Sequence, residues 1–175
     1  MQAIQKADRL FGLTRSDGSQ WLSDGFRILP LAQSRASKDI LIRERFAKSP
    51  NWRVLGKGRD CEALSKPIAA IEGFFERIPT LQVYPSVLWG IPKRTRTDLG
   101  IGQVFYSIKG VCVVSLEFLP ENFRDLDCFQ ADTDSVLYFM AAEGQVVAIC
   151  MPVTLREAAD LRTACEATLN AIPEL

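Results

Sequence analysis

The sequence predicts an α+β fold made of antiparallel hairpins with a few helices. Short apolar stretches alternate with turn dipeptides such as Asp24-Gly25 and Lys109-Gly110, which is typical of hairpins. Two other stretches repeat apolar residues at helical spacing. With 175 residues and 47% hydrophobic content, the chain is long enough to bury one compact core or two small ones.

The N-terminal part is expected to begin with strands. Residues 7–13 and 20–31 are predicted strand regions, joined by the polar turn at residues 15–19. Asp24-Gly25 predicts a tight turn inside the second region, between Trp21-Leu22 and residues 26–29. The apolar residues 40–42 predict a strand or a short helix, and a loop is expected over residues 51–60.

A helix is expected in the middle of the chain. Ser65 suits the cap and Pro67 the first turn, and Pro79 ends the segment. Between them, apolar residues recur at helical spacing: Ile68, Ile71, Phe74, Phe75 and Ile78. Residues 81–91 contain Pro85 and Gly90 and therefore favour an edge strand or a crossover.

Residues 94–102 are the predicted linker, which divides the chain into halves 1–92 and 93–175, or leaves one compact domain. In the second half we expect a hairpin of residues 103–108 and 111–118, then a short helix at 120–126. A further hairpin pairs residues 136–140 with 145–151, where Met151-Pro152 ends the strand. Thr154 caps a predicted last helix with an apolar stripe at Ala158, Leu161, Ala164, Cys165, Thr168 and Leu169.

The chain lacks the residues of common active sites. It contains no histidine, which removes the most frequent general base and metal ligand. The five cysteines never form a C-x-x-C pair, so we expect reduced core thiols. A calcium or magnesium loop is disfavoured because the later Glu and the internal Gly are missing around the carboxylates Asp125, Asp127, Asp132 and Asp134. The sequence therefore predicts a protein that is not an enzyme and holds no metal or cofactor.

Neither a membrane span nor a signal peptide is expected. No apolar run is long enough to cross a bilayer. The first residues, Met1 to Lys6, lack an apolar stretch followed by a cleavage site. A cytoplasmic protein without a membrane partner is the resulting prediction.

Charge is strongly separated along the chain although the net charge is zero. Residues 1–96 hold 17 Lys and Arg against 9 Asp and Glu, or +8, and residues 97–175 hold 4 against 12, or −8. Dense cations favour contacts to the phosphates of duplex DNA. The candidate DNA-binding residues are Arg35, Lys38, Arg43, Arg45, Lys48, Arg53, Lys57, Arg59, Lys93, Arg94 and Arg96. Alternatively, the basic half folds against the acidic half or oligomerises with it head to tail.

Four stretches, taken in order, resemble the bacterial DNA polymerase sliding clamp (β-clamp) superfamily, in particular reduced clamp-like proteins of phages and mobile elements. Residues 22–28, LSDGFRI, are similar to the family segment T-D-G-H-R-L, and residues 147–153, VAICMPV, to its strand ending V-V-M-P-M. Residues 83–92 and 116–126 resemble two further family segments. Phe26 stands where the family has histidine, and Val153 where it has methionine.

The resemblance implies a clamp-like fold with an extra C-terminal helix, and a noncatalytic adaptor for DNA or for replication proteins. It also implies a homo-oligomer and a hydrophobic groove that captures short peptide motifs of protein clients. By position, the groove would contain Ser23, Gly25, Phe26, Arg27, Ile28, Ile149, Met151, Pro152 and Val153. The alternative is that these residues are ordinary core and turn, with Phe26 itself filling the pocket.

A second function class remains open. A small phage or mobile-element protein with separated charge also suits an inhibitor that blocks a host nucleic-acid-binding or defence complex. The two hypotheses differ over DNA, because an inhibitor is expected to bind one protein tightly and no free duplex. Exposed Trp52 and Trp89 would favour a protein interface.

Overall fold

The structure, a computed structural model, describes residues 9–56, 60–92, 99–108, 110–131 and 136–152. Within these ranges the strands are β1 (Arg9–Thr14), β2 (Gln20–Ser23), β3 (Arg27–Pro30), β4 (Trp52–Leu55), β5 (Glu62–Ala63), β6 (Pro79–Gln82), β7 (Tyr84–Pro92), β8 (Leu99–Ser107), β9 (Gly110–Ser115), β10 (Asp127–Ala131), β11 (Leu137–Met140) and β12 (Val146–Cys150). The α-helices are α1 (Ile40–Lys48) and α2 (Ala69–Glu72). The described strand pairings are antiparallel, so the broad α+β prediction is confirmed.

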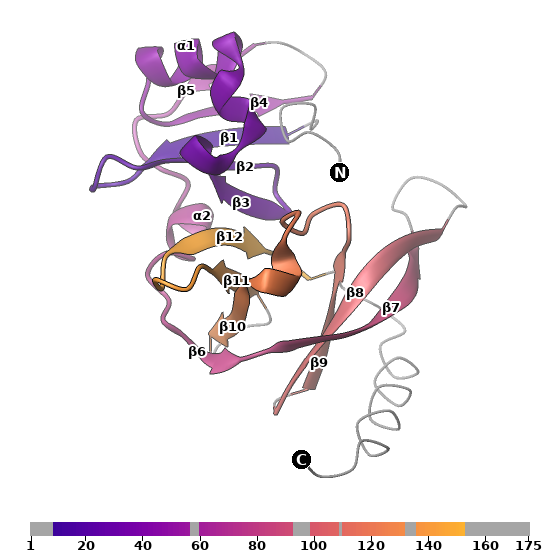
Figure 1. Cartoon of the computed structure of the whole chain (residues 1–175). Coiled ribbons are helices and arrows are strands. Elements are labelled where there is room, and N and C mark those ends of the chain that lie inside the picture. The colour runs from indigo at the N-terminus through magenta and orange to yellow at the C-terminus, as the bar shows by residue number, and fades with distance from the viewer. Residues whose placement is uncertain (1–8, 57–59, 93–98, 109, 132–135, 153–175) are drawn as a thin grey trace, which may run out of the picture.

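The described strands form two sheets (Figure 1). The larger has nine strands in the order β5-β4-β1-β2-β3-β12-β11-β10-β6, and the smaller has the order β7-β8-β9. The larger sheet therefore takes strands from both sides of the boundary predicted at residue 92.

The first hairpins follow the sequence prediction. β1 pairs with β2, and β2 with β3 across the Asp24-Gly25 turn. Gly25 has a φ of +86°, a conformation that glycine adopts without steric cost. The loop predicted over residues 51–60 is wrong for residues 52–55, which form β4 and pair with β1.

The apolar residues 40–42 begin a helix rather than a strand. Asp39 caps α1, and its carboxylate accepts hydrogen bonds from the amides of Leu41 and Ile42. Ile42 and Phe46 are buried one turn apart, in a cluster with Leu10, Leu22 and Trp52. α1 therefore covers one face of the N-terminal strands.

Trp52 is fully buried, so of the two tryptophans that would favour a protein interface if exposed, only Trp89 meets that condition. The partner of Trp52 across the β1–β4 ladder is Gly12, and a Cβ at Gly12 would overlap the indole ring. Phe46 packs edge-on against the same ring at 5.3 Å between centroids. A residue without a side chain is needed on β1 to make room for the indole.

The helix expected between Ser65 and Pro79 is much shorter. α2 spans only Ala69–Glu72, and Ile68 occupies its N-cap position without a side-chain hydrogen bond. Ser65 is therefore not the cap. Residues 73–75 continue in turns, because Gly73 follows the helix and the amides of Phe74 and Phe75 bond to Ile71 and Glu72.

The smaller sheet begins with an edge strand, as the prolines and the glycine predicted. β7 is at the edge beside β8, and its register shifts between Pro85 and Leu88. The buried Gln103 side chain donates to the carbonyls of Ser86 and Val87 at this irregularity. The predicted linker at 94–102 is wrong for residues 99–102, which belong to β8.

The two predicted C-terminal hairpins are present, whereas the strand β10 between them was not predicted. β8 and β9 form the hairpin around Gly110, and β11 and β12 form the hairpin expected from residues 136–151. The short helix expected at 120–126 is a 3₁₀ helix, Phe123–Asp125. The predicted last helix, Val153 and the DNA candidates Lys57, Arg59, Lys93, Arg94 and Arg96 lie outside the described residues.

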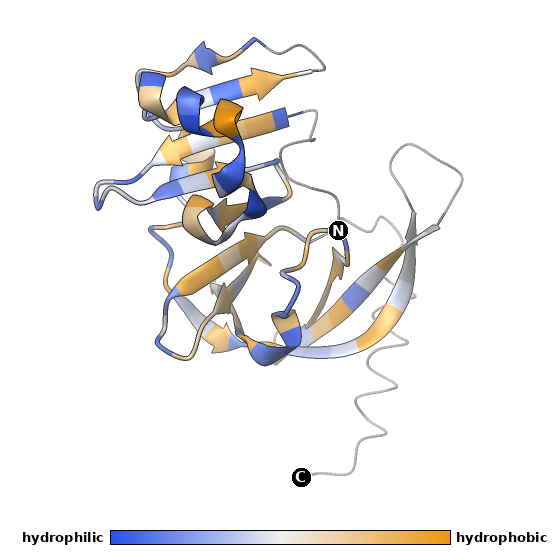
Figure 2. Ribbon diagram, turned by 45° about the horizontal axis from the view of Figure 1, so that its top comes forward, coloured by the Kyte–Doolittle hydropathy of each residue, from blue (hydrophilic) through white to orange (hydrophobic). Residues whose placement is uncertain are grey.

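The central strands of the large sheet separate two apolar layers. Alternate residues of β11 and β12 point to opposite faces: Phe139 and Cys150 pack with Phe105 of the small sheet, whereas Tyr138 and Ile149 pack with Ile71 of α2. Figure 2 shows hydrophobic residues along the strands of both sheets. Within the described residues, no helix is long and apolar enough to cross a membrane.

Replacing Gly12 by alanine should lower the free energy of unfolding by about 1–3 kcal/mol, because the new Cβ meets the Trp52 ring. Urea unfolding measures the change. Gly18, on the turn after β1, has open space around its Cα and is the control position for close contact, although its positive φ adds its own strain. An unchanged midpoint for Gly12→Ala would contradict the proposed packing.

Candidate functional site

Two of the four segments that carry the resemblance, residues 22–28 and 147–153, meet where β3 pairs with β12. β3 and β12 pair antiparallel, with Ile28 opposite Ile149 and Arg27 opposite Cys150. The amide of Met151 extends the contact by donating to the Phe26 carbonyl at 2.7 Å. The early Asp-Gly turn and the late Met-Pro strand end, about 120 residues apart in the chain, therefore form one junction in the sheet.

A buried ion pair fixes the turn at this junction. The Asp24 carboxylate accepts the backbone amides of Phe26 and Arg27 through Oδ1, and Oδ2 lies 3.0 Å from Arg27 Nε. Both side chains are at most 5% exposed. Arg27 Nη1 also donates to the carbonyl of Glu117 at 3.2 Å, so the pair connects the turn to the segment after β9.

The predicted groove residues divide between the two faces of the sheet. Ile28 and Ile149 are fully buried on the α2 side, where Met151 packs against them. On the other face, Phe26 stacks on Phe118 with ring centroids 4.7 Å apart. Ser23 is also buried, Gly25 is exposed and Pro152 is half-buried. The structure thus brings together Ile28, Ile149 and Met151, but it does not gather the whole predicted set into one groove.

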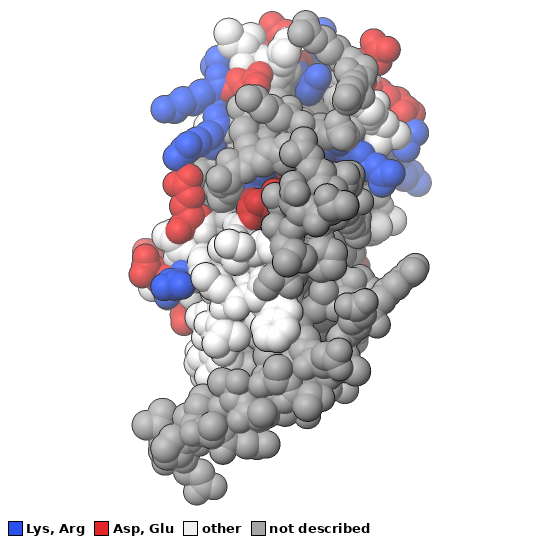
Figure 3. Space-filling view, turned by 90° about the vertical axis from the view of Figure 1, so that its right-hand side faces the viewer, with Lys and Arg blue, Asp and Glu red and all other residues white. Residues whose placement is uncertain are grey.

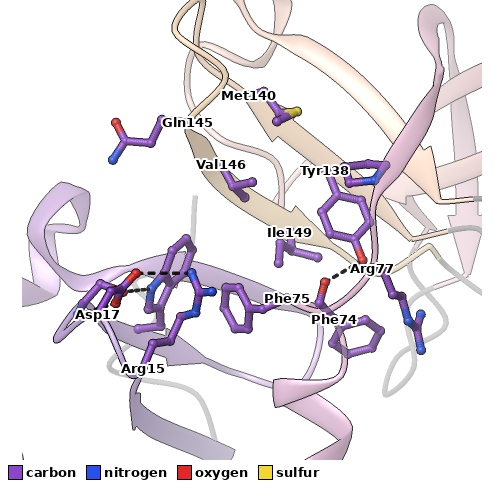
Figure 4. Close-up of a pocket in the computed structure, with 13 residues that line it drawn as sticks. Arg15, Asp17, Phe74, Phe75, Arg77, Tyr138, Met140, Gln145, Val146 and Ile149 are labelled. Atoms are coloured by element: carbon purple, nitrogen blue, oxygen red, sulfur yellow. Dashed lines mark hydrogen bonds and ion pairs between the residues drawn. The ribbon is translucent and has the colours of Figure 1, made fainter.

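A cavity of about 260 Å³ opens on the α2 side of the junction (Figure 4). It lies between the turn after β1, the residues that follow α2, and the β11–β12 hairpin. Ile149 is the predicted groove residue that lines it. The full lining is Arg15, Asp17, Ser19, Trp21, Phe74, Phe75, Arg77, Pro79, Tyr138, Met140, Gln145, Val146 and Ile149.

The cavity combines aromatic walls with a charged rim. Phe75 packs edge-on against Trp21, and the Arg15 guanidinium lies 4.6 Å from the Phe75 ring centre. The Tyr138 hydroxyl donates to the Phe74 carbonyl at 2.9 Å, a bond drawn in Figure 4. Such walls suit apolar or aromatic side chains of a ligand.

The rim beside Trp21 is a fixed chain of hydrogen bonds. Trp21 Nε1 donates to Ser19 Oγ, which donates to Asp17 Oδ1 at 2.6 Å. These bonds from Ser19 hold the pKa of the Asp17 carboxyl below its ordinary value. Asp17 therefore stays an anion near neutral pH and pairs with Arg15 at 3.6 Å.

Most of the cavity residues were not predicted as a site. The helical spacing singled out Phe74 and Phe75, but only as buried faces of a longer helix. Trp21 and Tyr138 were assigned to strands without a role. The alternation of strand residues could have placed Tyr138 and Ile149 on the face of the sheet opposite Phe139 and Cys150. It could not have shown that residues 73–75 cover Tyr138 and Ile149.

The basic candidates within the described residues lie on α1, on β4 and in the 3₁₀ turn before α1. Figure 3 shows Lys and Arg gathered there among acidic side chains. Arg53 pairs with Glu62 at 2.6 Å, Arg35 with Glu121 at 3.0 Å, and the Arg45 guanidinium lies 5.3 Å from the Trp52 ring centre. Lys38, Arg43 and Lys48 are exposed. The Arg35–Glu121 pair joins the basic half of the chain to the acidic half.

The buried thiols stay protonated at neutral pH. Burial raises the pKa of Cys112 to about 12, and it raises the pKa of Cys128 and Cys150 well above the usual thiol range. Cys61 is exposed, so the expectation of a core position is wrong for this residue. Among the described residues, no three Cys, Asp or Glu side chains are grouped so as to hold a metal ion.

No family model matches the chain, and neither do the curated proteins or the solved structures with which it was compared.

Replacing Arg27 by methionine should lower the free energy of unfolding by about 3–5 kcal/mol, because Asp24 would be left as an unpaired buried charge. Adding Asp24→Asn should recover a large part of that loss, since an amide oxygen can still accept the turn amides. Urea unfolding of both variants and of Asp24→Asn alone forms the double-mutant cycle. Strictly additive losses would show that the pair is not coupled.

Proposed function

We propose that this protein is a noncatalytic, sliding-clamp-like adaptor that captures an apolar peptide segment of a protein client at the β3–β12 junction. The observation that carries the proposal is the pairing of Ile28 with Ile149 beside an aromatic cavity. The two sequence segments that suggested a clamp-type pocket are thus neighbours in space, and one of them contributes a wall of the cavity.

The cavity has the chemistry of a peptide-binding site. Ile149, Val146 and Met140 supply aliphatic and thioether surface, and Trp21 supplies a ring whose indole N–H is already hydrogen-bonded to Ser19. An apolar client side chain buried there gains about 1.5–3 kcal/mol before the costs of association. Ile28 lies beneath this surface and is fully buried, so its role is to support the site.

Val146→Glu should weaken client binding by about tenfold or more, because it places a carboxylate in the apolar cavity. Peptides selected from a random 12-residue display library provide the ligands, and calorimetry provides the affinities. Val147→Glu is the matched control, since Val147 is also half-buried on β12 but packs on the opposite face. Equal losses in the two variants, or no selected peptides at all, would count against the cavity.

Association with duplex DNA is a second candidate function, favoured by exposed cations on and before α1. Lys38, Arg43 and Lys48 are exposed and have the reach to contact phosphates without reading sequence. Arg45 contacts the Trp52 ring and Arg53 pairs with Glu62, so both are weaker candidates for phosphate contacts. We also propose that the protein self-associates. Its mass in solution, measured with and without duplex DNA, tests self-association.

The double reversal Arg43→Glu with Lys48→Glu should reduce the salt dependence of duplex binding, lowering the slope of log K against log salt by about 2. A fluorescence-anisotropy titration at several salt concentrations measures the slope. Lys66→Glu with Arg124→Glu reverses two exposed cations elsewhere and should leave it nearly unchanged. If the wild-type protein does not bind duplex DNA but binds one host protein tightly, the result would instead support the inhibitor hypothesis.

A further inference from the structure

The chain covers its own junction with residues 68–77, here called the α2 segment. Ile71 is buried in one cluster with Ile28 and Ile149, and Phe74 and Phe75 pack half-buried against that cluster. Figure 4 shows Phe75 beside Ile149 and Phe74 below Tyr138. The apolar surface formed where β3 meets β12 is therefore already occupied by three side chains of the same chain.

These three side chains have the spacing of a short helical ligand. Ile71, Phe74 and Phe75 stand at positions i, i+3 and i+4, a spacing that shares one face of a helix. Here Phe74 and Phe75 follow the end of α2 in turns, and their amides donate to the carbonyls of Ile71 and Glu72. Peptides that dock into apolar grooves commonly present anchors at this spacing. The α2 segment thus presents to the sheet the pattern that a bound peptide presents to a receptor.

The backbone of the α2 segment is bonded mainly to itself. The amides of Ile71, Gly73 and Phe75 donate to Ile68, Ala69 and Glu72 within the segment. Its contacts with the sheet include the side-chain packing of Ile71, Phe74 and Phe75 and the hydrogen bond from Tyr138 to the Phe74 carbonyl. Detaching the segment therefore breaks none of these local bonds, which makes local opening far easier than removal of a paired strand.

We propose that the α2 segment is an intramolecular ligand of the junction, and that a client peptide binds by displacing it. This inference rests on the proposed peptide-binding function. It also defines the client: a segment with an aliphatic residue followed three and four positions later by aromatic residues. Affinity for such a client is set by competition, because the protein must first release its own Ile71, Phe74 and Phe75.

The probe is a synthetic peptide with the sequence of residues 66–80, and its control carries alanine in place of Ile71, Phe74 and Phe75. In the full-length protein, Phe74→Ala weakens the internal competitor but leaves the underlying sheet intact. The probe should then bind about fivefold more tightly or better than it binds the wild type. Phe123→Ala is the matched control, since Phe123 is another half-buried phenylalanine beside an arginine, on the other face of the sheet.

Whether Phe74→Ala strengthens or weakens probe binding decides whether the inference holds. If Phe74 is a fixed wall of a ready-made site, Phe74→Ala weakens probe binding, and the inference is overturned while the peptide-binding function stands. A probe that binds neither protein, when library peptides do bind in a Val146-dependent way, overturns it as well. If no peptide of any kind binds, the proposed function fails first.

Hydrogen exchange of the wild-type protein gives a second readout that does not depend on the variant folding. A saturating library peptide that binds in a Val146-dependent way, and that differs in sequence from residues 66–80, should increase deuterium uptake in fragments covering residues 68–77, because the displaced segment loses its protection from exchange. Uptake that falls or stays the same in the presence of bound peptide would show that the peptide binds beside the segment, and would overturn displacement.

Discussion

The buried Asp24–Arg27 pair is the constraint on which the junction depends. It closes the turn before β3, positions Arg27 opposite Cys150, and reaches the Glu117 carbonyl in the segment after β9. Three parts of the chain that are distant in sequence are thus fixed by one carboxylate and one guanidinium. A buried pair of this kind adds little net stability compared with apolar packing, but it specifies which strands meet, because an unpaired charge in any other arrangement is costly.

The two faces of the central sheet are covered by layers of different thickness. On the face of Arg27 and Cys150, the C-terminal strands pack against the small sheet and lie beside the buried Asp24–Arg27 pair. On the face of Ile28 and Ile149, the covering layer is a four-residue helix and the turns that follow it. The more thickly covered face supports the shape of the junction, and the thinly covered face is the one on which we propose that a partner binds.

Local chemistry made several elements predictable from the sequence. The Asp24-Gly25 turn, the hairpin around Gly110 and the Met151-Pro152 strand end are all present, because each depends on the conformational limits of glycine or proline. The errors came from long-range packing. Residues 52–55 form a strand in which Trp52 packs over Gly12 of β1. The helix after Ser65 ends at Glu72, and Phe74 and Phe75 then pack against the cluster that contains Ile149. The two segments predicted to line the groove are adjacent, but strand alternation places Arg27 and Ile28 on opposite faces of the sheet.

The strand order β3-β12 also constrains how the chain is made. β3 is synthesised early, whereas its neighbour β12 emerges after most of the sequence has been translated. Until then one edge of β3 stays unpaired on the ribosome, with its apolar side chains open to non-native pairing. A nascent chain that stalls between these two strands therefore presents an incomplete sheet, and chaperone binding is expected to concentrate in that interval of elongation.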